Sequence, residues 1–206
     1  MSKENKTYSS DWIHKLEGQY NWNLYWHQLD LVLNHSGIEK GSDINEIGVG
    51  TGLTSGFLKN KGYRVTTIDI DPEKEPDIVA DMTNFDFPKA DMYLGFEVFE
   101  HIPFKEAKSV WKQLAQKKVS RIAMSLPYAY RTYLWLEFWS PFFGKKSIHI
   151  GRKRNHINAE HHFWELGIES YNTELIIREM KNLGFSVSIS YRYRNHHFFL
   201  FSNEFK

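Results

Sequence analysis

The 206-residue sequence contains no cysteine. Disulfide bonds and thiolate chemistry are therefore excluded, and because the composition fits a reducing compartment we expect a cytoplasmic protein. The sequence also lacks an excess of charge of one sign, since 26 lysines and arginines balance 25 aspartates and glutamates to a formal net charge of +1. Without a strong positive field, binding to nucleic acid is not expected.

Long apolar segments are missing too. The start of the chain, MSKENKTYSSD, is polar, which argues against a secretory signal. The most apolar stretch, 126–143, is interrupted by two charges and two prolines and is barely long enough to span a bilayer. We therefore expect no transmembrane segment, and the length predicts a single domain over residues 1–206.

From residue 43 onward, short apolar runs alternate with helical patterns. Strands are predicted at 43–47, 64–70, 78–80, 91–96, 119–125, 185–191 and 197–202, and helices at 53–60, 104–117 and 173–183. This alternation predicts an α/β fold with a mostly parallel sheet covered by helices on both faces. The last two strands lie too close together for a crossover helix, so they should pair antiparallel.

Two segments fall outside this alternation. Residues 1–36 form a predicted N-terminal helical extension, in which apolar residues such as Trp22 and Trp26 recur at helical spacing. Residues 127–170 form a long, aromatic insertion after the fifth strand. We expect this insertion to be a helical cap over the carboxyl edge of the sheet.

Glycines cluster in the segment 44–58, INEIGVGTGLTSGFL, which places Gly48, Gly50 and Gly52 between a strand and a helix. Glycine reaches positive φ at little cost and lets backbone approach a ligand. A phosphate-binding P-loop is excluded because no lysine follows at the required spacing, and a GxGxxG fingerprint fails because the third glycine comes one residue early. A glycine-rich turn without a ligand stays open as the alternative.

Residues 46–52, EIGVGTG, resemble the ExGxGxG motif of the class I S-adenosylmethionine-dependent methyltransferases. Three further elements of that superfamily follow in order: Asp69 after the second strand, Asp81-Met82 after the third, and EVFEH at 97–101 after the fourth. The resemblance covers about 43–103. It implies a Rossmann-like, mostly parallel seven-stranded sheet with an antiparallel last strand, here carrying the helical cap after strand 5.

The resemblance also implies S-adenosylmethionine as the cofactor. It assigns the following residues to the donor: Glu46, Gly48, Val49, Gly50, Gly52, Asp69, Ile70, Asp81, Met82 and Glu97. In this assignment the methionine end of the donor lies against bare glycine backbone, Asp69 accepts from the ribose hydroxyls, and Asp81 accepts from the adenine amino group. Asp69 would repel a 2′-phosphate, which disfavours NADP but not NAD. The alternative for Asp81 is a helix N-cap or turn.

The expected reaction is an in-line methyl transfer in which the protein mainly aligns donor and acceptor. An oxygen or nitrogen nucleophile often needs a base, and imidazole titrates near the working pH. Our candidate bases are His101 in the EVFEH motif and His161 in the cap, with a structural role as the alternative for each. Two histidines spaced as in HExxH are missing, as is the Asp, Asp, Asn set of the metal-dependent catechol-type enzymes, so no metal site is predicted.

The acceptor is not specified by the sequence. The aromatic stretch 126–143 could line an apolar acceptor pocket, form a dimer interface or rest on a membrane surface. In the basic stretch 145–158, Arg152 and Arg154 could contact phosphate or carboxylate, or the stretch is simply solvated. We expect O- or N-methylation of a small-molecule, glycan or lipid-linked acceptor. An NAD-linked oxidoreductase and a non-catalytic binding protein with the same fold stay open as alternatives.

Overall fold

A computed structural model of the chain describes residues 18–157 and 161–203. Its centre is a seven-stranded sheet with the order β3-β2-β1-β4-β5-β9-β8. These strands are β1 (Asp43–Ile47), β2 (Arg64–Asp69), β3 (Ile78–Val79), β4 (Met92–Phe96), β5 (Arg121–Pro127), β8 (Phe185–Tyr193) and β9 (His196–Asn203). The first five are parallel, and β9 is antiparallel to both of its neighbours. The predicted Rossmann-like sheet with an antiparallel last strand is confirmed.

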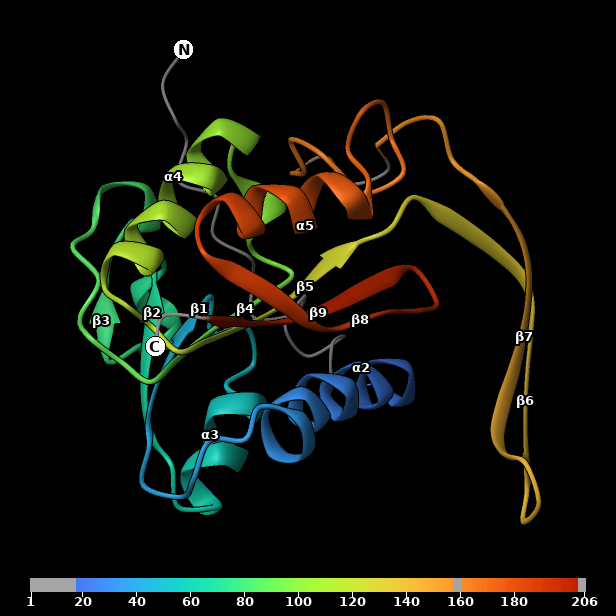
Figure 1. Cartoon of the computed structure of the whole chain (residues 1–206), viewed down its shortest axis with the longest axis horizontal. Coiled ribbons are helices and arrows are strands. Elements are labelled where there is room, and N and C mark those ends of the chain that lie inside the picture. The colour runs from blue at the N-terminus through green and yellow to red at the C-terminus, as the bar shows by residue number, and fades with distance from the viewer. Residues whose placement is uncertain (1–17, 158–160, 204–206) are drawn as a thin grey trace.

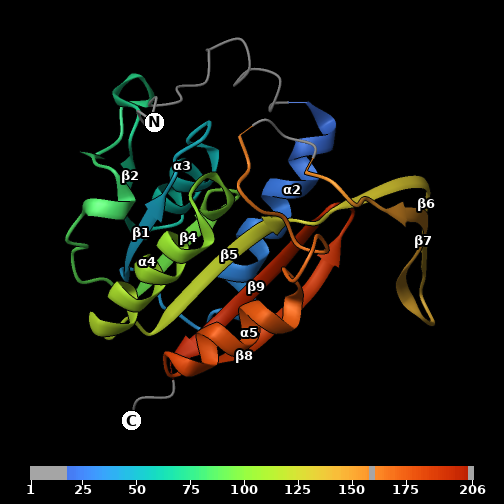
Figure 2. The same ribbon diagram turned by 90° about the horizontal axis from the view of Figure 1, so that it is seen from above.

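Helices cover both faces of this sheet (Figures 1 and 2). One face carries α4 (Phe104–Gln116) and α5 (Thr173–Asn182), and the other carries α2 (Gln19–Asp30), the π-helical turn Leu31–His35 and α3 (Leu53–Asn60). Short 3-10 turns at Pro72–Lys74, Met82–Asn84 and Phe99–His101 follow strands β2, β3 and β4. None of the described helices is both long and apolar enough to cross a membrane.

The core consists of one apolar cluster on each face of the sheet. Helix α4 buries Ala107, Val110, Trp111 and Leu114, which recur at the three- and four-residue spacing of an amphipathic helix. All five residues of β4 are buried, as expected for a parallel strand covered on both faces. Each fully buried large apolar side chain contributes about 1.5–3 kcal/mol to folding.

Helix α2 lies against the glycine-rich turn that follows β1. The hydroxyl of Thr51 donates to the Tyr25 hydroxyl at 3.1 Å, and that of Thr54 donates to Gln28 Oε1 at 3.0 Å. The described part of the predicted N-terminal extension is therefore helical and holds this turn in place. Residues 1–17 of the extension lie outside the described part of the chain.

The expected helical conformation of the insertion 127–170 is wrong. Strands β6 (Tyr130–Ser140) and β7 (Gly144–Lys153) instead form a separate two-stranded sheet that extends from the body of the protein (Figure 1). Leu134, Leu136 and Phe138 in β6 and Ile148 and Ile150 in β7 recur at every second position, and the aromatic side chains of β6 favour extended backbone. We call this hairpin, Tyr130–Lys153, the arm.

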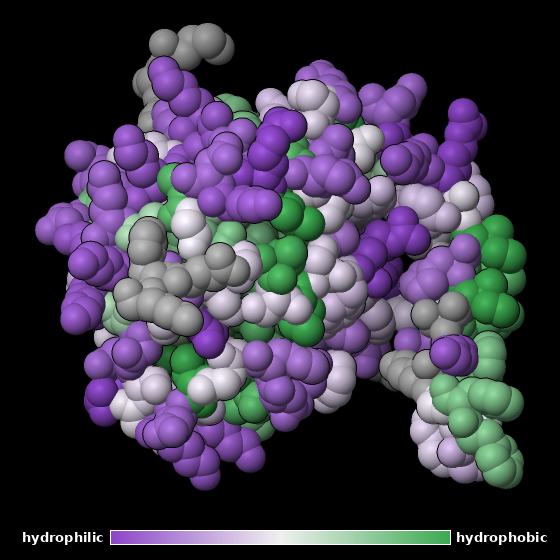
Figure 3. Space-filling view, viewed as in Figure 1, coloured by the Kyte–Doolittle hydropathy of each residue, from purple (hydrophilic) through white to green (hydrophobic). Residues whose placement is uncertain are grey.

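The two faces of the arm differ. On one face Leu134 pairs with Ile150 and Leu136 with Ile148, and all four side chains are exposed. Figure 3 shows these hydrophobic residues gathered over the arm, away from the mainly hydrophilic surface of the body. The apolar surface of the arm is therefore directed to its surroundings and not into the core.

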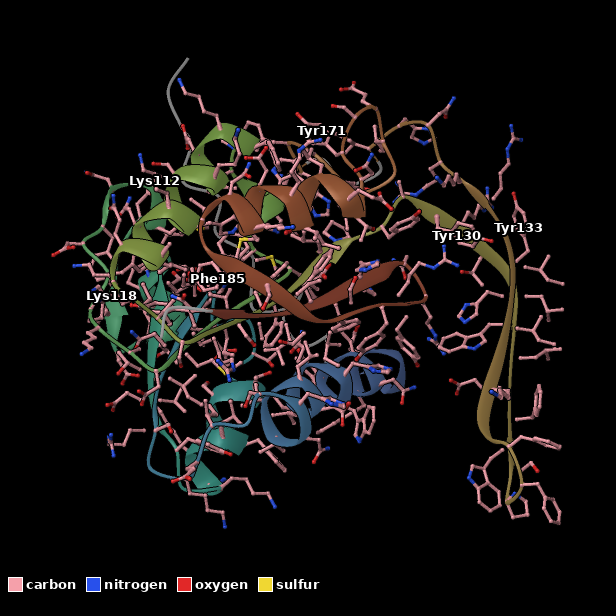
Figure 4. All side chains as sticks on the ribbon, viewed as in Figure 1. Lys112, Lys118, Tyr130, Tyr133, Tyr171 and Phe185 are labelled. Carbon is pink, nitrogen blue, oxygen red and sulfur yellow. The ribbon has the colours of Figure 1, made fainter. Side chains whose placement is uncertain are left out.

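The opposite face of the arm meets the body at the turn between β8 and β9. The indole ring of Trp135 lies 4.5 Å from the Tyr193 ring and 3.9 Å from the Arg194 guanidinium. Closer to the base of the arm, the Arg192 guanidinium lies 4.3 Å from the ring of Tyr130, which Figure 4 labels. A few aromatic and cation–π contacts thus attach the arm to the body.

Candidate active site

The glycine-rich turn between β1 and α3 has the backbone conformation that its sequence predicts. Gly48, Gly50 and Gly52 all adopt left-handed φ angles, of 81°, 58° and 72°. The N–H of Gly48 donates to the Ile68 carbonyl at 2.8 Å, which ties the start of the turn to β2. Residues with a Cβ adopt this conformation at a cost, so glycine is the suitable residue at each position.

The surroundings of these glycines differ in a way that matters for binding. A Cβ atom on Gly48 would approach Val98 Cγ2 to 2.8 Å, so this glycine allows the turn to pack against the segment after β4. A Cβ atom on Gly50 would meet no atom within 4 Å. The backbone at Gly50 is therefore open to a ligand.

Asp69 ends β2 directly beside this turn. Its carboxylate accepts the N–H of Val49 at 2.8 Å and the N–H of Asp71 at 2.9 Å, and Lys74 Nζ lies 3.7 Å away. A carboxylate has about four lone-pair positions, so two backbone bonds leave capacity for ligand hydroxyls. The next side chain, Ile70, is 39% exposed and offers an apolar surface at the same strand end.

Asp81 and Met82 follow β3. Oδ1 of Asp81 accepts the N–H of Thr83 at 2.9 Å and its hydroxyl at 2.8 Å, and so caps the 3-10 turn Met82–Asn84. The N-cap that the sequence raised as an alternative is therefore present. Because both bonds use Oδ1, the capping role does not occupy Oδ2. Met82 is partly buried and packs against the core.

Glu46 is the most unusual side chain on the donor side. It is only 3% exposed, and among the described residues its Oε2 has no hydrogen-bond partner. Burial raises the pKa of Glu46 to about 8, because the charged form loses its hydration. Buried polar atoms without partners are rare and costly in folded proteins, so this oxygen beside the glycine turn fits a site that receives a polar ligand group.

Glu97 begins a second group of ionisable residues, after β4. It adopts a left-handed φ of 51°, which is uncommon for a residue with a side chain and occurs preferentially at functional sites. Its Oε2 lies 3.0 Å from Nδ1 of His196. Burial pushes the pKa of Glu97 upward, but the neighbouring His196 imidazole and the Ser125 hydroxyl outweigh burial and hold it below its usual range.

Three residues farther along, Glu100 is fully buried, and neither of its carboxylate oxygens has a hydrogen-bond partner in the described part of the chain. Its Oε1 lies 3.9 Å from Nε2 of His101 and 4.0 Å from Nε2 of His162. Burial raises the pKa of Glu100 well above its usual range, and the charge of Glu97 acts in the same direction. Burial also lowers the pKa of His101 to about 4, so its imidazole is neutral near pH 7.

His162 reaches this group from the loop after the arm. The N–H of Phe163 donates to the Glu100 carbonyl at 2.8 Å, and the indole N–H of the fully buried Trp164 donates to the Ile102 carbonyl at 3.0 Å. These bonds fix the loop on the 3-10 turn Phe99–His101. Two segments that are about 60 residues apart in the sequence thereby form one site.

In both His101 and His162, the Nδ1 atom has a hydrogen-bond acceptor. Nδ1 of His101 lies 3.2 Å from the His161 carbonyl oxygen, and Nδ1 of His162 lies 3.0 Å from Glu165 Oε1. Arg154 donates to the other oxygen of Glu165 at 2.7 Å. The pKa of Glu165 lies below its usual range because the hydrogen bond from His162 and the charge of Arg154 outweigh its burial.

The structure brings the sequence-predicted donor residues together at the carboxyl ends of β1 to β4, where the parallel strands share one edge. The two predicted bases occupy different positions. His101 enters the buried group with its ring, whereas His161 contributes its backbone carbonyl.

Sequence reasoning did not select four members of the site, namely Glu100, His162, Glu165 and His196. Glu100 was visible within EVFEH, but its complete burial depends on the tertiary fold. The three-residue spacing of His162 and Glu165 was the available signal for their hydrogen bond. His196 had no sequence signal, because only the pairing of β8 with β9 places it beside Glu97.

Comparison with known proteins supports the architecture. The sequence matches no protein-family model and no curated protein. Among solved structures, an S-adenosylmethionine-dependent methyltransferase from Clostridium acetobutylicum ATCC 824 superposes with a TM-score of 0.63 at 10% identity, over 94% of this chain and 98% of that one. The magnesium protoporphyrin IX methyltransferase ChlM from Synechocystis PCC 6803, with bound S-adenosylmethionine, gives a TM-score of 0.59 at 15% identity, over 97% and 87%.

A third neighbour is the N-methyltransferase NodS from Bradyrhizobium japonicum WM9 in complex with S-adenosylhomocysteine. It gives a TM-score of 0.61 at 11% identity, over 93% of this chain and 91% of that one. These similarities extend over nearly the whole length of each partner, and the sheet is mostly parallel with an antiparallel last strand, as expected from the sequence. The chain therefore has the fold of the S-adenosylmethionine-dependent methyltransferases.

Proposed function

We propose that this chain is an S-adenosylmethionine-dependent methyltransferase. The observation that carries the proposal is the turn between β1 and α3, in which Gly48, Gly50 and Gly52 all have left-handed φ and Gly50 is open to a ligand beside the Asp69 carboxylate. Solved proteins of the same fold that bind S-adenosylmethionine or S-adenosylhomocysteine support it.

The proposed donor site uses the residues at the carboxyl edge of the sheet. The glycine backbone and the unpartnered Oε2 of Glu46 receive the methionine end, and Asp69 receives the ribose hydroxyls. The adenine end is assigned to Ile70, Asp81 and Met82. When bound, the donor supplies an electrophilic methyl group on a sulfonium. The protein contributes mainly alignment, which is worth about 7–11 kcal/mol in well-oriented reactions.

The proposed acceptor side consists of Glu97, the loop that carries His161, and the insertion 127–170 with its exposed apolar arm. We propose O- or N-methylation of a small-molecule, glycan or lipid-linked acceptor in the cytoplasm, with peripheral membrane contact through the arm. His101 is a weak base because burial lowers its pKa to about 4. We therefore retain His161 as the candidate base.

Calorimetry with S-adenosylhomocysteine tests the donor site. The variant Gly50→Ala adds a methyl group where the ligand is expected, so it should weaken binding at least about tenfold, or about 1.4 kcal/mol. The matched control is Gly37→Ala, because Gly37 also has a left-handed φ, of 69°, and open space around its Cβ position, but lies outside the site. It should share the backbone strain of Gly50→Ala and retain the affinity.

Two further measurements separate the remaining classes. Transfer of labelled methyl groups to fractionated cell extract distinguishes an enzyme from a protein that only binds the donor. A titration with NAD tests the oxidoreductase alternative. Well-folded protein that binds NAD but neither S-adenosylmethionine nor S-adenosylhomocysteine would overturn the proposed function.

A further inference from the structure

Glu100, His101 and His162 place three metal-ligating atoms close together, with Glu100 buried and both histidines partly buried. One carboxylate oxygen and two imidazole nitrogens all lie within 4.8 Å of one another. In a tetrahedral zinc site with bonds of 2.0–2.2 Å, ligand atoms are about 3.4 Å apart. The separations of 3.9 and 4.0 Å between Glu100 and the two histidines need to close by about half an ångström each, and the two imidazole nitrogens, which lie within 4.8 Å of each other, need to close by about 1.4 Å at most.

We propose that Glu100, His101 and His162 bind one divalent transition-metal ion. The strongest reason is Glu100 itself, which is fully buried and has no hydrogen-bond partner on either oxygen within the described ranges. Buried carboxylates in proteins are paired with donors or coordinate metals. A cation between this carboxylate and the two imidazoles satisfies the side chain.

The orientation of both histidines supports coordination through Nε2. A carbonyl and a carboxylate only accept hydrogen bonds, so the His161 carbonyl and Glu165 each fix the proton of the neighbouring histidine on Nδ1. In both rings the unprotonated Nε2 then faces Glu100. This arrangement presents three lone pairs to the same point.

The surroundings of the site match those of protein metal centres. Ligating histidines usually donate their second N–H to a carboxylate or a backbone carbonyl, and both forms occur here. Glu165, which accepts from His162, is itself held by Arg154 at 2.7 Å. A buried chain from Arg154 through Glu165 to His162 therefore orients one ligand before any ion is present.

The ligand types indicate the class of ion. Two imidazoles and one carboxylate suit Zn²⁺, Mn²⁺, Fe²⁺ and Co²⁺, and three protein ligands leave a coordination position for another molecule. The usual order of stability predicts tighter binding of Zn²⁺ than of Mn²⁺. The inference goes beyond the proposed function and concerns metal binding alone, so it does not depend on methyl transfer.

The experiment uses the full chain after removal of metal with a chelator. Calorimetric titration with Zn²⁺ and Mn²⁺ should show one ion per chain, and Co²⁺ should give the visible absorption of a low-coordinate site with nitrogen and oxygen ligands. Glu100→Gln and His162→Gln should weaken metal binding about 100-fold or more. Arg154→Met should weaken it about 10–100-fold, as is usual for residues that orient a metal ligand through hydrogen bonds.

Controls keep the test independent of folding and of the donor. His156→Gln, at an exposed histidine near the arm, and Glu39→Gln, at an exposed surface glutamate, should bind metal as the wild type does. Circular dichroism reports whether each variant folds, and Glu100→Gln is expected to fold because the amide has nearly the same shape as the carboxyl group. S-adenosylhomocysteine binding is measured separately, so either proposal can fail alone.

Two results would overturn the metal site. One is folded, metal-free wild-type protein that binds none of the three ions stoichiometrically, which would leave the cluster as a proton-sharing network. The other is stoichiometric binding that neither Glu100→Gln nor His162→Gln weakens.

Discussion

The molecule contains two sheets built from similar residues in opposite environments. In the seven-stranded sheet, Phe198, Phe199 and Phe201 of β9 are fully buried between helices. In the two-stranded arm, Leu136 and Phe138 of β6 are about half exposed. Apolar content alone therefore does not distinguish a core strand from an exposed one, because burial depends on whether other elements cover the strand.

This difference bears on stability and on function. The large sheet is stabilised by burial on both faces, whereas isolated two-stranded hairpins are marginal in water. Contacts of Trp135 with Tyr193 and Arg194 attach the arm to the body. An apolar surface exposed on a weakly attached element is typical of binding regions, which supports the proposed role of the arm at the acceptor.

The largest expected effect compares one aromatic residue from each sheet. Phe199→Ala removes a fully buried ring and should lower the free energy of unfolding by about 3–5 kcal/mol. Phe142→Ala, at a residue that is 87% exposed at the tip of the arm, should change it by less than about 0.5 kcal/mol. Chemical denaturation measures both. Equal losses would contradict the contrast between body and arm.

The pH dependence of stability should also separate the two regions. Because the pKa of Glu46 is raised from 4.5 to about 8, the folded state keeps a proton that the unfolded state loses between these values. Stability from this group is present below about pH 4.5 and is lost as the pH rises toward 8. Glu46→Gln should remove this loss, which is at most about 5 kcal/mol.

The control for this prediction is Glu137→Gln in the arm, where the side chain is exposed and the pH profile should stay as in the wild type. Denaturation midpoints across the pH range measure the difference. A Glu46→Gln profile that follows the wild type at every pH would contradict the raised pKa, because it would show that other interactions offset the burial of the charged Glu46 side chain.

The smallest expected effect is local and concerns the contact of the arm with the turn between β8 and β9. Trp135→Ala removes the contacts with Tyr193 and Arg194, which should lower the stability of the arm by about 1–2 kcal/mol. Hydrogen exchange should become faster in β6 and β7 and stay unchanged in the large sheet. Tyr133→Ala, on the same strand and largely exposed, is the control. Faster exchange throughout the body would mean that the arm and the core unfold together.

Local features of the sequence were sufficient for most of the fold. Strand β1 and helix α3 have the predicted bounds, and the glycine turn between them has the predicted positive φ angles. These features depend on residues close together in the chain, whose periodicity and backbone preferences can be interpreted directly. The parallel sense of most of the sheet was predictable as well, because strands joined by helical connections pair in parallel.

The tertiary structure alone decided the conformation of the arm and the composition of the buried site. Aromatic side chains in 127–170 fit a helix or a strand locally, and the pairing of β6 with β7 selected the strand. Glu100, His162 and His196 come from three distant segments, and their distances depend on how the loop after the arm and the β8–β9 hairpin pack on the sheet. The sequence determines such contacts only through the complete fold, since the positions of these side chains depend on residues that lie far apart along the chain.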